Sequence, residues 1–481
     1  MAHSPLFVAF CCRVELFVLI VLGRLRDSCG RLSGVSRYKI ANRPGFAPLL
    51  PTFANFYIRR IYHRFRDVLS RPVGSAPGSH IDVIERYSPD GNRTLINKVG
   101  VYRRCLNLSS YNYLGFADDW LATCSESVLP TVELLGAASV SPALEFGTSS
   151  VHVELEATIA KFIGKPAALV YHMGFGTNTT SIPAFMGKGS LIISDALNHT
   201  SLVNGMRTSG ATICVFRHNE LDHLEQLLRE KISEGQPRTH RPWTKVLVVV
   251  EGIYSMEGEI VDLRAVVDIV KKYKAYLYVD EAHSIGALGK TGRGICEHAG
   301  VNPSEVDILM GTFSKSFGGM GGYIAASEEI INTIRTSSAG TLYTVALSPV
   351  VAQQVLTAFN LLLGSLGSQR LVRLRENSNY FRRGLEAMGL LTLGDVDSPV
   401  IPVLLFHMTK CHVFSRLCME RNLAVATVAS PGVPLFFCRA RFCISAAHTR
   451  EDLNVALQVI REASDICGVR FNKRQAIAKV P

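Results

Sequence analysis

AYLYVDEAH (275–283) and DILMGTFSKSFGGMGG (307–322) are the two stretches that decide how this chain folds. Each begins with a short, continuous apolar run and ends in reactive side chains, among them Asp280 and Lys315. A continuous rather than alternating apolar pattern indicates a strand that is covered on both faces, as in a parallel sheet. Ligands of an open α/β sheet bind at the carboxyl ends of its strands. We therefore expect Asp280 and Lys315 to lie together at one edge of a sheet.

Five further apolar runs of the same kind surround these two stretches. They are AALVYHMGF (167–175), SLIISDALNH (190–199), ATICVFRHN (211–219), KVLVVVEGIYSM (245–256) and GGYIAAS (321–327). Helix-like segments such as LDHLEQLLREKISEG separate several of the runs, and this alternation is typical of βαβ units. After Pro349 the pattern changes to a long helical segment, two strand-like runs (VIPVLLF and ARFCISA) and a final helix. The sequence therefore predicts an α/β large domain (131–350) with a mostly parallel sheet and a smaller α+β domain (351–481).

Composition limits the classes of function. The chain has 481 residues, 47% hydrophobic and 19% charged, which is typical of a globular protein and excludes a disordered one. The net charge of +11 has much of its excess before residue 105, which favours an anionic membrane surface or a nucleic acid as partner. No zinc-finger, RNP-like or helix-turn-helix pattern accompanies the basic residues, so we expect no nucleic acid. The twelve cysteines are scattered without a CxxC pair, so we expect reduced thiols and no metal site.

The N-terminus carries a mostly apolar stretch, residues 5–23, of about one membrane thickness as a helix. Arg13 and Glu15 lie near its middle, where each would cost about 3 kcal/mol at the bilayer centre. A single span, an in-plane helix and a signal peptide are all open, although the stretch lacks a basic n-region and a cleavage site. The arginines that follow place the rest of the chain in the cytosol. We predict a membrane-associated segment with a basic flank (1–50), followed by an N-terminal arm (51–130).

The reactive residues at the strand ends suit one type of chemistry. A partly desolvated amine such as Lys315 has a lowered pKa and can attack a carbonyl to form an imine. A carboxylate such as Asp280 can hold a proton on a pyridine nitrogen, which keeps the ring an electron sink. The segment MGFGTN (173–178) offers backbone amides and Thr177 to an anion at a helix start. His199 follows the next strand, where an imidazole can stack on an aromatic ring.

Each of these features also has an ordinary structural explanation. A single lysine after a strand is usually a solvated charge, and a single histidine such as His199 is usually a hydrogen-bonded core residue. A DEAH run also occurs in helicases, but no GxxxxGK[ST] motif accompanies it, and GALGKTGRG has the wrong spacing for a phosphate loop. The functional interpretation therefore depends on the order and spacing of MGFGTN, LNH, DEAH and TFSK taken together.

These motifs, in this order, resemble the α-oxoamine synthase family of fold-type-I pyridoxal-phosphate (PLP) enzymes. The closer match, from about residue 52 to 465, is to the branch of the family that makes sphingolipid long-chain bases. The stretches that carry this match are SYNYLGFA (110–117), SDALNHTSLV (194–203), GQPRTHRPW (235–243), VEGIYSMEG (250–258), DEAHSIGALGKTGRG (280–294), GTFSKSFGGMGGYIA (311–325) and RARFCISAAHT (439–449). Two stretches depart from the family pattern, SPGVP (430–434) and YTVALSP (343–349).

The resemblance implies catalytic roles for four residues that match the family's motifs. Lys315 would bind PLP covalently as an imine, and Asp280 would pair with the pyridinium nitrogen of the cofactor. His283 would contact the oxygen on the cofactor ring. His199 would stack on the ring and help to hold the substrate carboxylate.

Five more residues gain roles in binding from the same resemblance. Gly174, Phe175 and Thr312 would bind the phosphate of PLP. Arg441 would contact a carboxylate or the acyl-CoA. His152 matches a family signature in GTSSVHVELE (147–156) and is predicted to lie near the substrate.

The resemblance also implies the reaction and the partners. The substrates would be L-serine and a long-chain acyl-CoA, palmitoyl-CoA, and their decarboxylative condensation would give 3-ketodihydrosphinganine, the first step of sphingolipid biosynthesis. A sister subunit without the lysine would form a heterodimer with this chain at the endoplasmic reticulum membrane, with catalysis facing the cytosol. Two alternatives remain open: a related synthase that uses glycine and a short acyl-CoA, and a non-catalytic scaffold subunit of the same complex.

Overall fold

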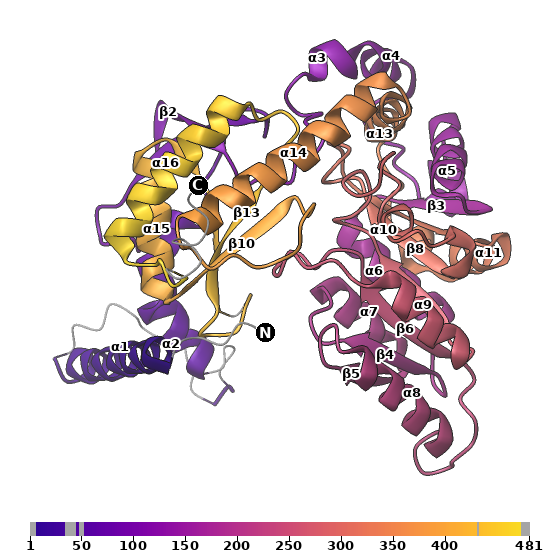
Figure 1. Cartoon of the computed structure of the whole chain (residues 1–481), viewed down its shortest axis with the longest axis horizontal. Helices are drawn as coiled ribbons and strands as arrows, with labels where there is room; N and C mark the ends of the chain where they lie inside the picture. Colours follow the sequence, from indigo (N-terminus) through magenta and orange to yellow (C-terminus); the bar gives the residue numbers. More distant parts are fainter. Residues whose placement is uncertain (1–5, 34–44, 48–51, 431, 473–481) are drawn as a thin grey trace.

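A sheet of seven strands forms the centre of the larger of two lobes in the computed structural model, which describes residues 6–33, 45–47, 52–430 and 432–472 (Figure 1). The strands lie in the order β3-β9-β8-β7-β6-β4-β5. Their bounds are β3 (Ala167–Tyr171), β4 (Leu191–Asp195), β5 (Thr212–Phe216), β6 (Val246–Glu251), β7 (Tyr276–Asp280), β8 (Ile308–Thr312) and β9 (Gly322–Ala326). Each of the seven apolar runs of the sequence is one of these strands, which confirms the predicted α/β fold.

The sheet is parallel except at β9, which runs antiparallel to both β3 and β8. In the parallel part, Glu251 at the end of β6 lies opposite Asp280 at the end of β7. Asp280 in turn lies opposite Met310 in β8, two residues before that strand ends. The register therefore brings the last residues of three strands to the same edge of the sheet, as the sequence predicts.

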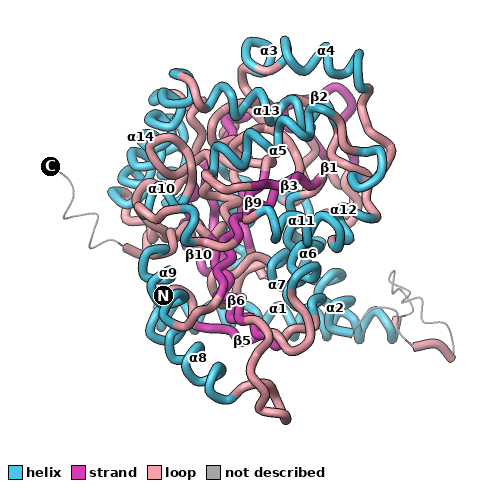
Figure 2. Tube along the Cα trace, turned by 90° about the vertical axis from the view of Figure 1, so that its right-hand side faces the viewer, coloured by secondary structure: helices cyan, strands magenta, loops and turns pink. Residues whose placement is uncertain are grey.

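Helices cover both faces of the sheet (Figure 2). One face carries α5 (Ser150–Ile163), α8 (Leu221–Glu234), α9 (Leu263–Lys272) and α13 (Pro349–Leu362), and the other carries α6 (Gly174–Phe185), α7 (Thr200–Ser209) and α11 (Glu328–Ser337). Within β3, Leu169 belongs to one core and Val170 to the other. Burial on both sides is the physical reason for the continuous apolar pattern of these strands.

The smaller lobe contains a three-stranded sheet in the order β10-β13-β12. Its elements are α14 (Ser365–Ala387), β10 (Val400–Phe406), α15 (Met408–Glu420), β11 (Leu423–Ala424), β12 (Ala426–Val428), β13 (Cys438–Cys443) and α16 (Arg450–Cys467). The predicted long helical segment is two helices, because α13 and α14 meet at a bend of 84°. Gly364 caps α14 there, and the Leu362 carbonyl leaves no room for a Cβ at Gly367.

The N-terminal arm forms a third, separate sheet. After α2 (Thr52–Arg60) and η1 (Tyr62–Val68), the strands β1 (His80–Tyr87) and β2 (Ile96–Asn107) pair antiparallel, and β11 adds to β2. The sequence predicted an arm but no hairpin, because the first seven residues of β2 are exposed and show no apolar alternation. The remaining short helices are α3 (Trp120–Thr123), α4 (Ser125–Leu135), η2 (Ala143–Gly147), α10 (Ile295–Ala299), η3 (Pro303–Glu305) and α12 (Ala339–Leu342). The domain boundaries at 51, 131 and 351 stay predictions.

The apolar N-terminal stretch is part of a single helix, α1 (Leu6–Leu32). Within the described residues, α1 is the one unbent helix that is long and apolar enough to cross a membrane, with a window at Leu6–Gly30 of mean hydropathy 2.4. The bent pair of α13 and α14 meets the same test only when the two helices are taken together. Most of that window of α1 is exposed, so α1 is not a core helix.

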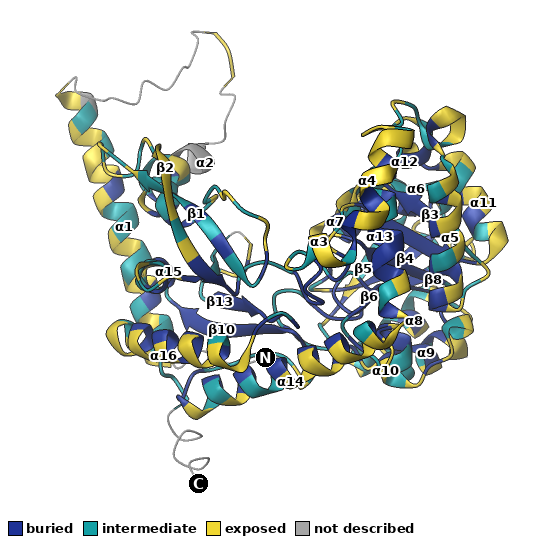
Figure 3. Ribbon diagram, turned by 90° about the horizontal axis from the view of Figure 1, so that it is seen from above, coloured by how far each residue is buried: buried dark blue, intermediate teal, exposed yellow. Residues whose placement is uncertain are grey.

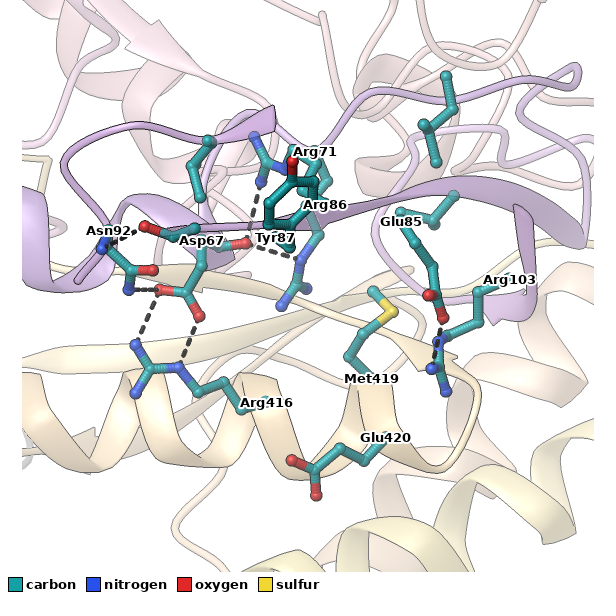
Figure 4. A pocket seen from close by; sticks show the side chains of 14 residues that line it. Asp67, Arg71, Glu85, Arg86, Tyr87, Asn92, Arg103, Arg416, Met419 and Glu420 are labelled. Carbon is teal, nitrogen blue, oxygen red and sulfur yellow. Dashed lines mark hydrogen bonds and ion pairs between the residues drawn. The ribbon is translucent and has the colours of Figure 1, made fainter. Parts of the chain in front are cut away.

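Charged side chains join the arm to the smaller lobe around a cavity of about 390 Å³ (Figure 4). Asp67 accepts two hydrogen bonds from Arg416 of α15, at 2.6 Å from Nε and 2.8 Å from Nη2. Arg71 and Arg86 donate to backbone carbonyls at the end of η1, including that of Asp67. Arginine side chains here bond to Asp67 and to backbone carbonyls, and the residues that line the cavity do not include a group suited to catalysis. We therefore interpret this cavity as a structural joint between the arm and the smaller lobe.

Replacing Arg416 by alanine should loosen this joint. A two-bond Arg–carboxylate pair that is partly exposed contributes about 1 kcal/mol, so amide hydrogen exchange in β1 and β2 should become roughly fivefold faster. Hydrogen-exchange mass spectrometry measures this effect. Arg421→Ala is the matched control, because Arg421 pairs with Glu462 of α16 and does not contact the arm. Equal rates of amide hydrogen exchange in β1 and β2 of the two variants would contradict the role of Arg416 in joining the arm to the smaller lobe.

Candidate active site

A cavity of about 630 Å³ lies at the carboxyl ends of β6, β7 and β8. Seven of the nine residues predicted from the sequence line it: Gly174, Phe175, His199, Asp280, His283, Thr312 and Lys315. Other residues that line it and that the sequence analysis did not assign include Tyr111, His172, Asn178, Ser201, Glu251 and Ser255. Segments more than 200 residues apart in the chain thus meet in one cavity.

Lys315 follows β8 and reaches into the cavity, where its Nζ lies 5.7 Å from the centre of the Tyr111 ring. The protein around the half-buried side chain removes most bulk water from the amine. This burial lowers the pKa of Lys315 to about 8, although the carboxyl groups of Asp280 and Glu251 oppose the shift. At pH 7 about a tenth of the amine is therefore neutral, far more than for a lysine in water, and the neutral form is the one that attacks a carbonyl.

Asp280 is buried at the end of β7, and two donors fix its carboxylate. Asn178 Nδ2 donates to Oδ2 and the backbone N–H of Ala282 donates to Oδ1, both at 2.8 Å. Asn178 is itself held, because Tyr278 donates its hydroxyl proton to Asn178 Oδ1 at 2.7 Å. A carboxylate that accepts two fixed hydrogen bonds keeps one orientation toward the cavity.

The same asparagine connects Asp280 to His199. Asn178 Nδ2 also donates to Ser201 Oγ at 2.9 Å, and the Ser201 hydroxyl lies 2.7 Å from His199 Nδ1. Since Ser201 Oγ accepts from Asn178, its proton goes to His199 Nδ1, which leaves the imidazole proton on Nε2. Burial among the cavity walls lowers the pKa of His199, and the charge of Lys315 adds to this. His199 is therefore neutral near pH 7 and open to the cavity.

His283 also lines the cavity and is neutral near pH 7. Burial lowers its pKa well below the usual range, and burial raises that of Tyr113 well above it. Tyr113 therefore keeps its proton and donates it to His283 Nδ1 at 2.8 Å. The Nε2–H of His283 is left to donate to a ligand.

Glu251 is a second buried carboxyl beside Asp280. Burial raises its pKa well above the usual range, and the neighbouring charge of Asp280 adds to the shift. Glu251 Oε1 accepts a short hydrogen bond from the backbone N–H of His199. We infer that Glu251 is protonated and holds the start of α7.

An anion site is built at the start of α6. The first N–H groups of a helix have no intrahelical partner, and Gly174 and Phe175, the first two residues of α6, line the cavity. A Cβ at position 174 would lie 2.6 Å from Thr312 Oγ1, so only glycine permits this approach. Thr312 also contacts Ser314, at 2.8 Å between the two hydroxyl oxygens. Amides and hydroxyls in this arrangement fit a phosphate group.

The two predicted substrate residues, His152 and Arg441, do not line this cavity. His152 is buried at the start of α5, where Nδ1 caps the helix through Ser149 and Nε2 bonds to the Leu347 carbonyl at 2.8 Å. Both of its ring nitrogens are thus used within the chain. Arg441 in β13 lies behind the cavity wall, with its guanidinium 4.7 Å from the centre of the Tyr111 ring. Its Nε is buried without a hydrogen-bond partner in the described part of the chain.

The segment between β6 and α9, which brings Ser255 and Met256 to the cavity, is fixed by two groups of charges. His218 bonds to Asp195 at 2.8 Å and to Glu259 at 3.1 Å. Arg439 of β13 donates to the Met256 carbonyl at 2.6 Å and to Glu257 at 3.0 Å. β13 of the smaller lobe therefore fixes one segment of the cavity wall without lining the cavity itself.

Sequence reasoning missed several residues of this site. Asn178 ends the quoted segment MGFGTN, but a buried amide can be assigned a role only when its partners are known. Tyr113 and Ser201 also fall inside quoted motifs. Each lies two positions after a residue of the site, Tyr111 or His199, and this spacing was the signal that could have identified them. Thr344, which was not assigned to the site, lies 3.2 Å from His172 Nδ1. Pro431 of the SPGVP segment lies outside the described residues.

Comparisons with known proteins agree with this geometry. Residues 103–460 match the family model for aminotransferase class I and II. The chain is 51% identical to long chain base biosynthesis protein 2b of Arabidopsis thaliana over 472 residues, which covers 96% of this chain and 95% of the relative. It is 48% identical to serine palmitoyltransferase 2 of Dictyostelium discoideum, covering 95% of this chain and 93% of the relative.

Solved structures give the same result. A serine palmitoyltransferase of Sphingomonas wittichii superposes with a TM-score of 0.77 at 28% identity and covers 88% of this chain and 100% of its own. A structure described as SPT with PLP internal aldimine superposes with a TM-score of 0.76 at 26% identity, covering 87% and 100%. The fold is therefore that of the fold-type-I PLP enzymes, as predicted.

The chain belongs to the class I and II aminotransferase family of PLP-dependent enzymes. Within that class, it belongs to the serine palmitoyltransferase family, together with the long chain base biosynthesis proteins 2. This confirms the resemblance that the sequence motifs carry.

The His218 cluster makes the stability of the chain depend on pH. Burial by itself would lower the pKa of His218, but its hydrogen bonds to Asp195 and Glu259 outweigh burial and raise the pKa to about 9. A raised pKa gives stability that is fully present below the unfolded value of about 6.5 and is lost as the pH rises to 9. Over this window we expect a loss of about 3 kcal/mol, measured as the free energy of unfolding.

The variant His218→Gln should lose this pH dependence, since glutamine carries no titrating proton. His298→Gln is the matched control, because His298 is exposed and distant from the cluster. Urea unfolding at pH 6.5 and 9.5 compares the three proteins. A His218→Gln slope as steep as that of the wild type would rule out this role.

Proposed function

We propose that this chain is the catalytic subunit of a serine palmitoyltransferase, which condenses L-serine with palmitoyl-CoA to give 3-ketodihydrosphinganine. The observation that carries the proposal is the cavity in which Lys315, with a pKa of about 8, shares space with the fixed carboxylate of Asp280. The family membership and the names of the relatives support the choice of substrates. In the overall reaction serine Cα bonds to the thioester carbon, CoA leaves as a thiol, and the serine carboxyl leaves as CO₂.

PLP fits the residues of the cavity. Lys315 would hold its aldehyde carbon, Asp280 its ring nitrogen, His283 Nε2–H its ring oxygen, and the start of α6 its phosphate. When bound, PLP supplies an electron sink for the negative charge that develops on the carbon next to the amino nitrogen. The residues of this chain supply everything else: position, protons and exclusion of water.

Lys315 is the proton carrier of the proposed reaction. In its neutral form Nζ can take the proton from serine Cα, and its position after β8 keeps it at the edge where the strand ends meet. The Asn178 and Ala282 donors keep Asp280 aimed into the cavity. His199, neutral and open to the cavity, can stack on the ring of the cofactor. Positioned groups of this kind contribute about 10²–10⁴-fold each to the rate.

Arg441 is the proposed group for the serine carboxylate. Its guanidinium lies against Tyr111 and its Nε has no partner in the described residues, so a charged donor is available beside the cavity. A small movement of Tyr111 would bring this donor to a ligand. The predicted contact of His152 with substrate has less support, because both of its ring nitrogens are already hydrogen-bonded.

A second subunit and a membrane complete the proposal. Met173, Phe175 and Met320 line the cavity with side chains that are 42–53% exposed, which suits a mouth that another chain covers. Phe146 and Tyr343, which do not line the cavity, are further exposed apolar residues, at 93% and 80% exposure. We propose a sister non-catalytic subunit as the covering chain. The apolar helix α1 suits attachment to the endoplasmic reticulum membrane, where the acyl donor and the product partition.

Replacing Lys315 by alanine should abolish the condensation, because both the covalent attachment and the proton carrier are lost. We expect a drop in product formation of at least about 10²–10⁴-fold. The assay follows 3-ketodihydrosphinganine from serine and palmitoyl-CoA in the purified complex. Borohydride reduction and peptide mapping of the wild type should place the pyridoxyl label on Lys315.

Lys290→Ala provides the control, since Lys290 is exposed and lies outside the cavity. This variant should keep both the label and the activity. A label on any other lysine, or full activity of Lys315→Ala, would overturn the proposed site. An unlabelled and inactive wild type would favour the scaffold alternative.

Substrate choice separates this function from the related synthases. Serine with palmitoyl-CoA should give a kcat/KM far above that of glycine with succinyl-CoA, because only the former pair suits an enzyme attached to a membrane by an apolar helix. Both pairs are compared on one preparation. A preference for glycine and the short acyl-CoA would refute the proposed substrates without affecting the PLP site.

A further inference from the structure

Helix α1 has two opposite faces, and only one of them contacts the rest of the chain. Residues of the packed face recur every three or four positions: Cys12, Glu15, Leu16, Leu19, Gly23 and Asp27. The opposite face is apolar and exposed, and consists of Phe7, Phe10, Val14, Phe17, Leu22 and Leu25. At 3.6 residues per turn these two sets lie on opposite sides of the helix. Figure 3 shows α1 along the outer edge of the smaller lobe.

The charged residues on the packed face are paired with the protein. Glu15 contacts His407 Nδ1 at 3.0 Å and bonds to the Thr409 hydroxyl, both at the start of α15. Twelve residues later, Asp27 accepts hydrogen bonds from Arg59 and Arg60 of α2, each with a contact at 2.9 Å. The acidic side chains that interrupt the apolar stretch of α1 therefore serve to dock it.

The spacing of these two docking contacts decides how α1 can meet a membrane. Glu15 and Asp27 are about 18 Å apart along the helix axis, whereas the hydrocarbon core of a bilayer is about 30 Å thick. A helix that crosses the core cannot keep both contacts with a lobe that remains in water. The docked arrangement and a transmembrane arrangement of α1 thus exclude each other.

One edge of the exposed face is basic. Arg13 and Arg24 lie on this flank of the apolar stripe, and both are exposed. The guanidinium of Arg13 also lies 5.7 Å from the centre of the Phe436 ring, and that of Arg24 lies 5.0 Å from the centre of the Phe56 ring. Arginines in these positions can reach lipid phosphates while the apolar side chains enter the boundary of the acyl chains. Their charge is complementary to that of an anionic leaflet.

We propose that α1 does not span the membrane but lies in the plane of the cytosolic leaflet, with its Phe7–Leu25 stripe in the lipid and its acidic face docked on the smaller lobe. The inference rests on the proposed membrane location and specifies its geometry. It places both ends of α1 on the cytosolic side. The smaller lobe, which carries Arg441, is then held against the lipid surface from which a long acyl chain arrives.

A topology assay tests the proposal directly. The full-length chain, coexpressed with its sister subunit, carries a glycosylation-acceptor tag before Met1, and a reporter with a spanning helix and a luminal N-terminus is the positive control. We expect the tag to remain unglycosylated and to be removed by protease added to intact microsomes. A glycosylated or protected tag would overturn the proposal, because it would place the N-terminus in the lumen.

Vesicle flotation tests the apolar face. The double variant Phe10→Glu/Phe17→Glu should bind vesicles of phosphatidylcholine and phosphatidylserine at least roughly tenfold more weakly than the wild type. The reason is that two aromatic rings that would enter the lipid are replaced by charged side chains. The matched control is Val455→Glu/Ile466→Glu, which places two charges at exposed apolar positions of α16 and should bind normally. Equal binding of the Phe10/Phe17 variant and the wild type would reject the proposed lipid face.

The result can be separated from the fate of the catalytic proposal. Condensation activity and pyridoxyl labelling are measured in detergent, where the mode of membrane contact has no influence. Normal labelling with a luminal N-terminus would reject the in-plane helix alone. Absence of labelling with a cytosolic N-terminus and normal flotation would reject the catalytic proposal alone.

Discussion

The site depends on the fixed position of one buried carboxylate, that of Asp280. Two donors hold it, and the one from a side chain, Asn178, is itself fixed by Tyr278 and connected through Ser201 to His199. Five residues from α6, β7 and the start of α7 thus form one hydrogen-bond network, and all of them except Tyr278 line the cavity. In a low-dielectric environment such a network resists reorientation, because any rotation would leave a buried polar group without a partner.

The same environment divides two neighbouring carboxyl groups into different states. Asp280 and Glu251 face each other across adjacent strands, and two like charges at that distance would be costly. Burial and the neighbouring charge of Asp280 raise the pKa of Glu251, which favours its protonated form and avoids this cost. The amine of Lys315 then has one carboxylate opposite it, and burial brings its pKa close to the physiological range. A proton carrier and a fixed negative charge therefore follow from the same buried geometry.

The network lies in the larger lobe, on α6, β7 and the start of α7, and the smaller lobe has a different role. The seven-stranded sheet supplies the rigid edge from which Asp280 and Lys315 project. The smaller lobe supplies β13, whose Arg439 fixes the Met256 segment while Arg441 lies against Tyr111. It also carries α1, which docks by Glu15 and Asp27 on α15 and α2. Binding of a soluble amino acid and access to a lipid acyl chain can thus be handled by separate parts of one chain.

The sequence by itself determined the sheet and the reactive strand ends. Seven continuous apolar runs predicted seven strands, because strands that are covered on both faces need apolar residues at every position. It also determined that Asp280, His283 and Lys315 would meet, because the ends of parallel strands share one edge of the sheet. Local periodicity could not show the β1–β2 hairpin, whose exposed residues carry no apolar pattern, or the bend between α13 and α14 at Gly364.

Only the tertiary structure decided which partner each side chain has. Two of these partnerships depend on contacts between residues that are distant in the chain: Asn178 holds Asp280, and the surroundings of Glu251 favour its protonated form. A third depends on local hydrogen-bond geometry, because His152 caps the helix α5 in which it lies. The role of Glu15 is the clearest case. In the sequence it is a charge that interrupts an apolar stretch, and in the folded chain it is paired with His407 across 392 positions. Sequence patterns report burial, whereas the pairing of polar groups is set by three-dimensional proximity.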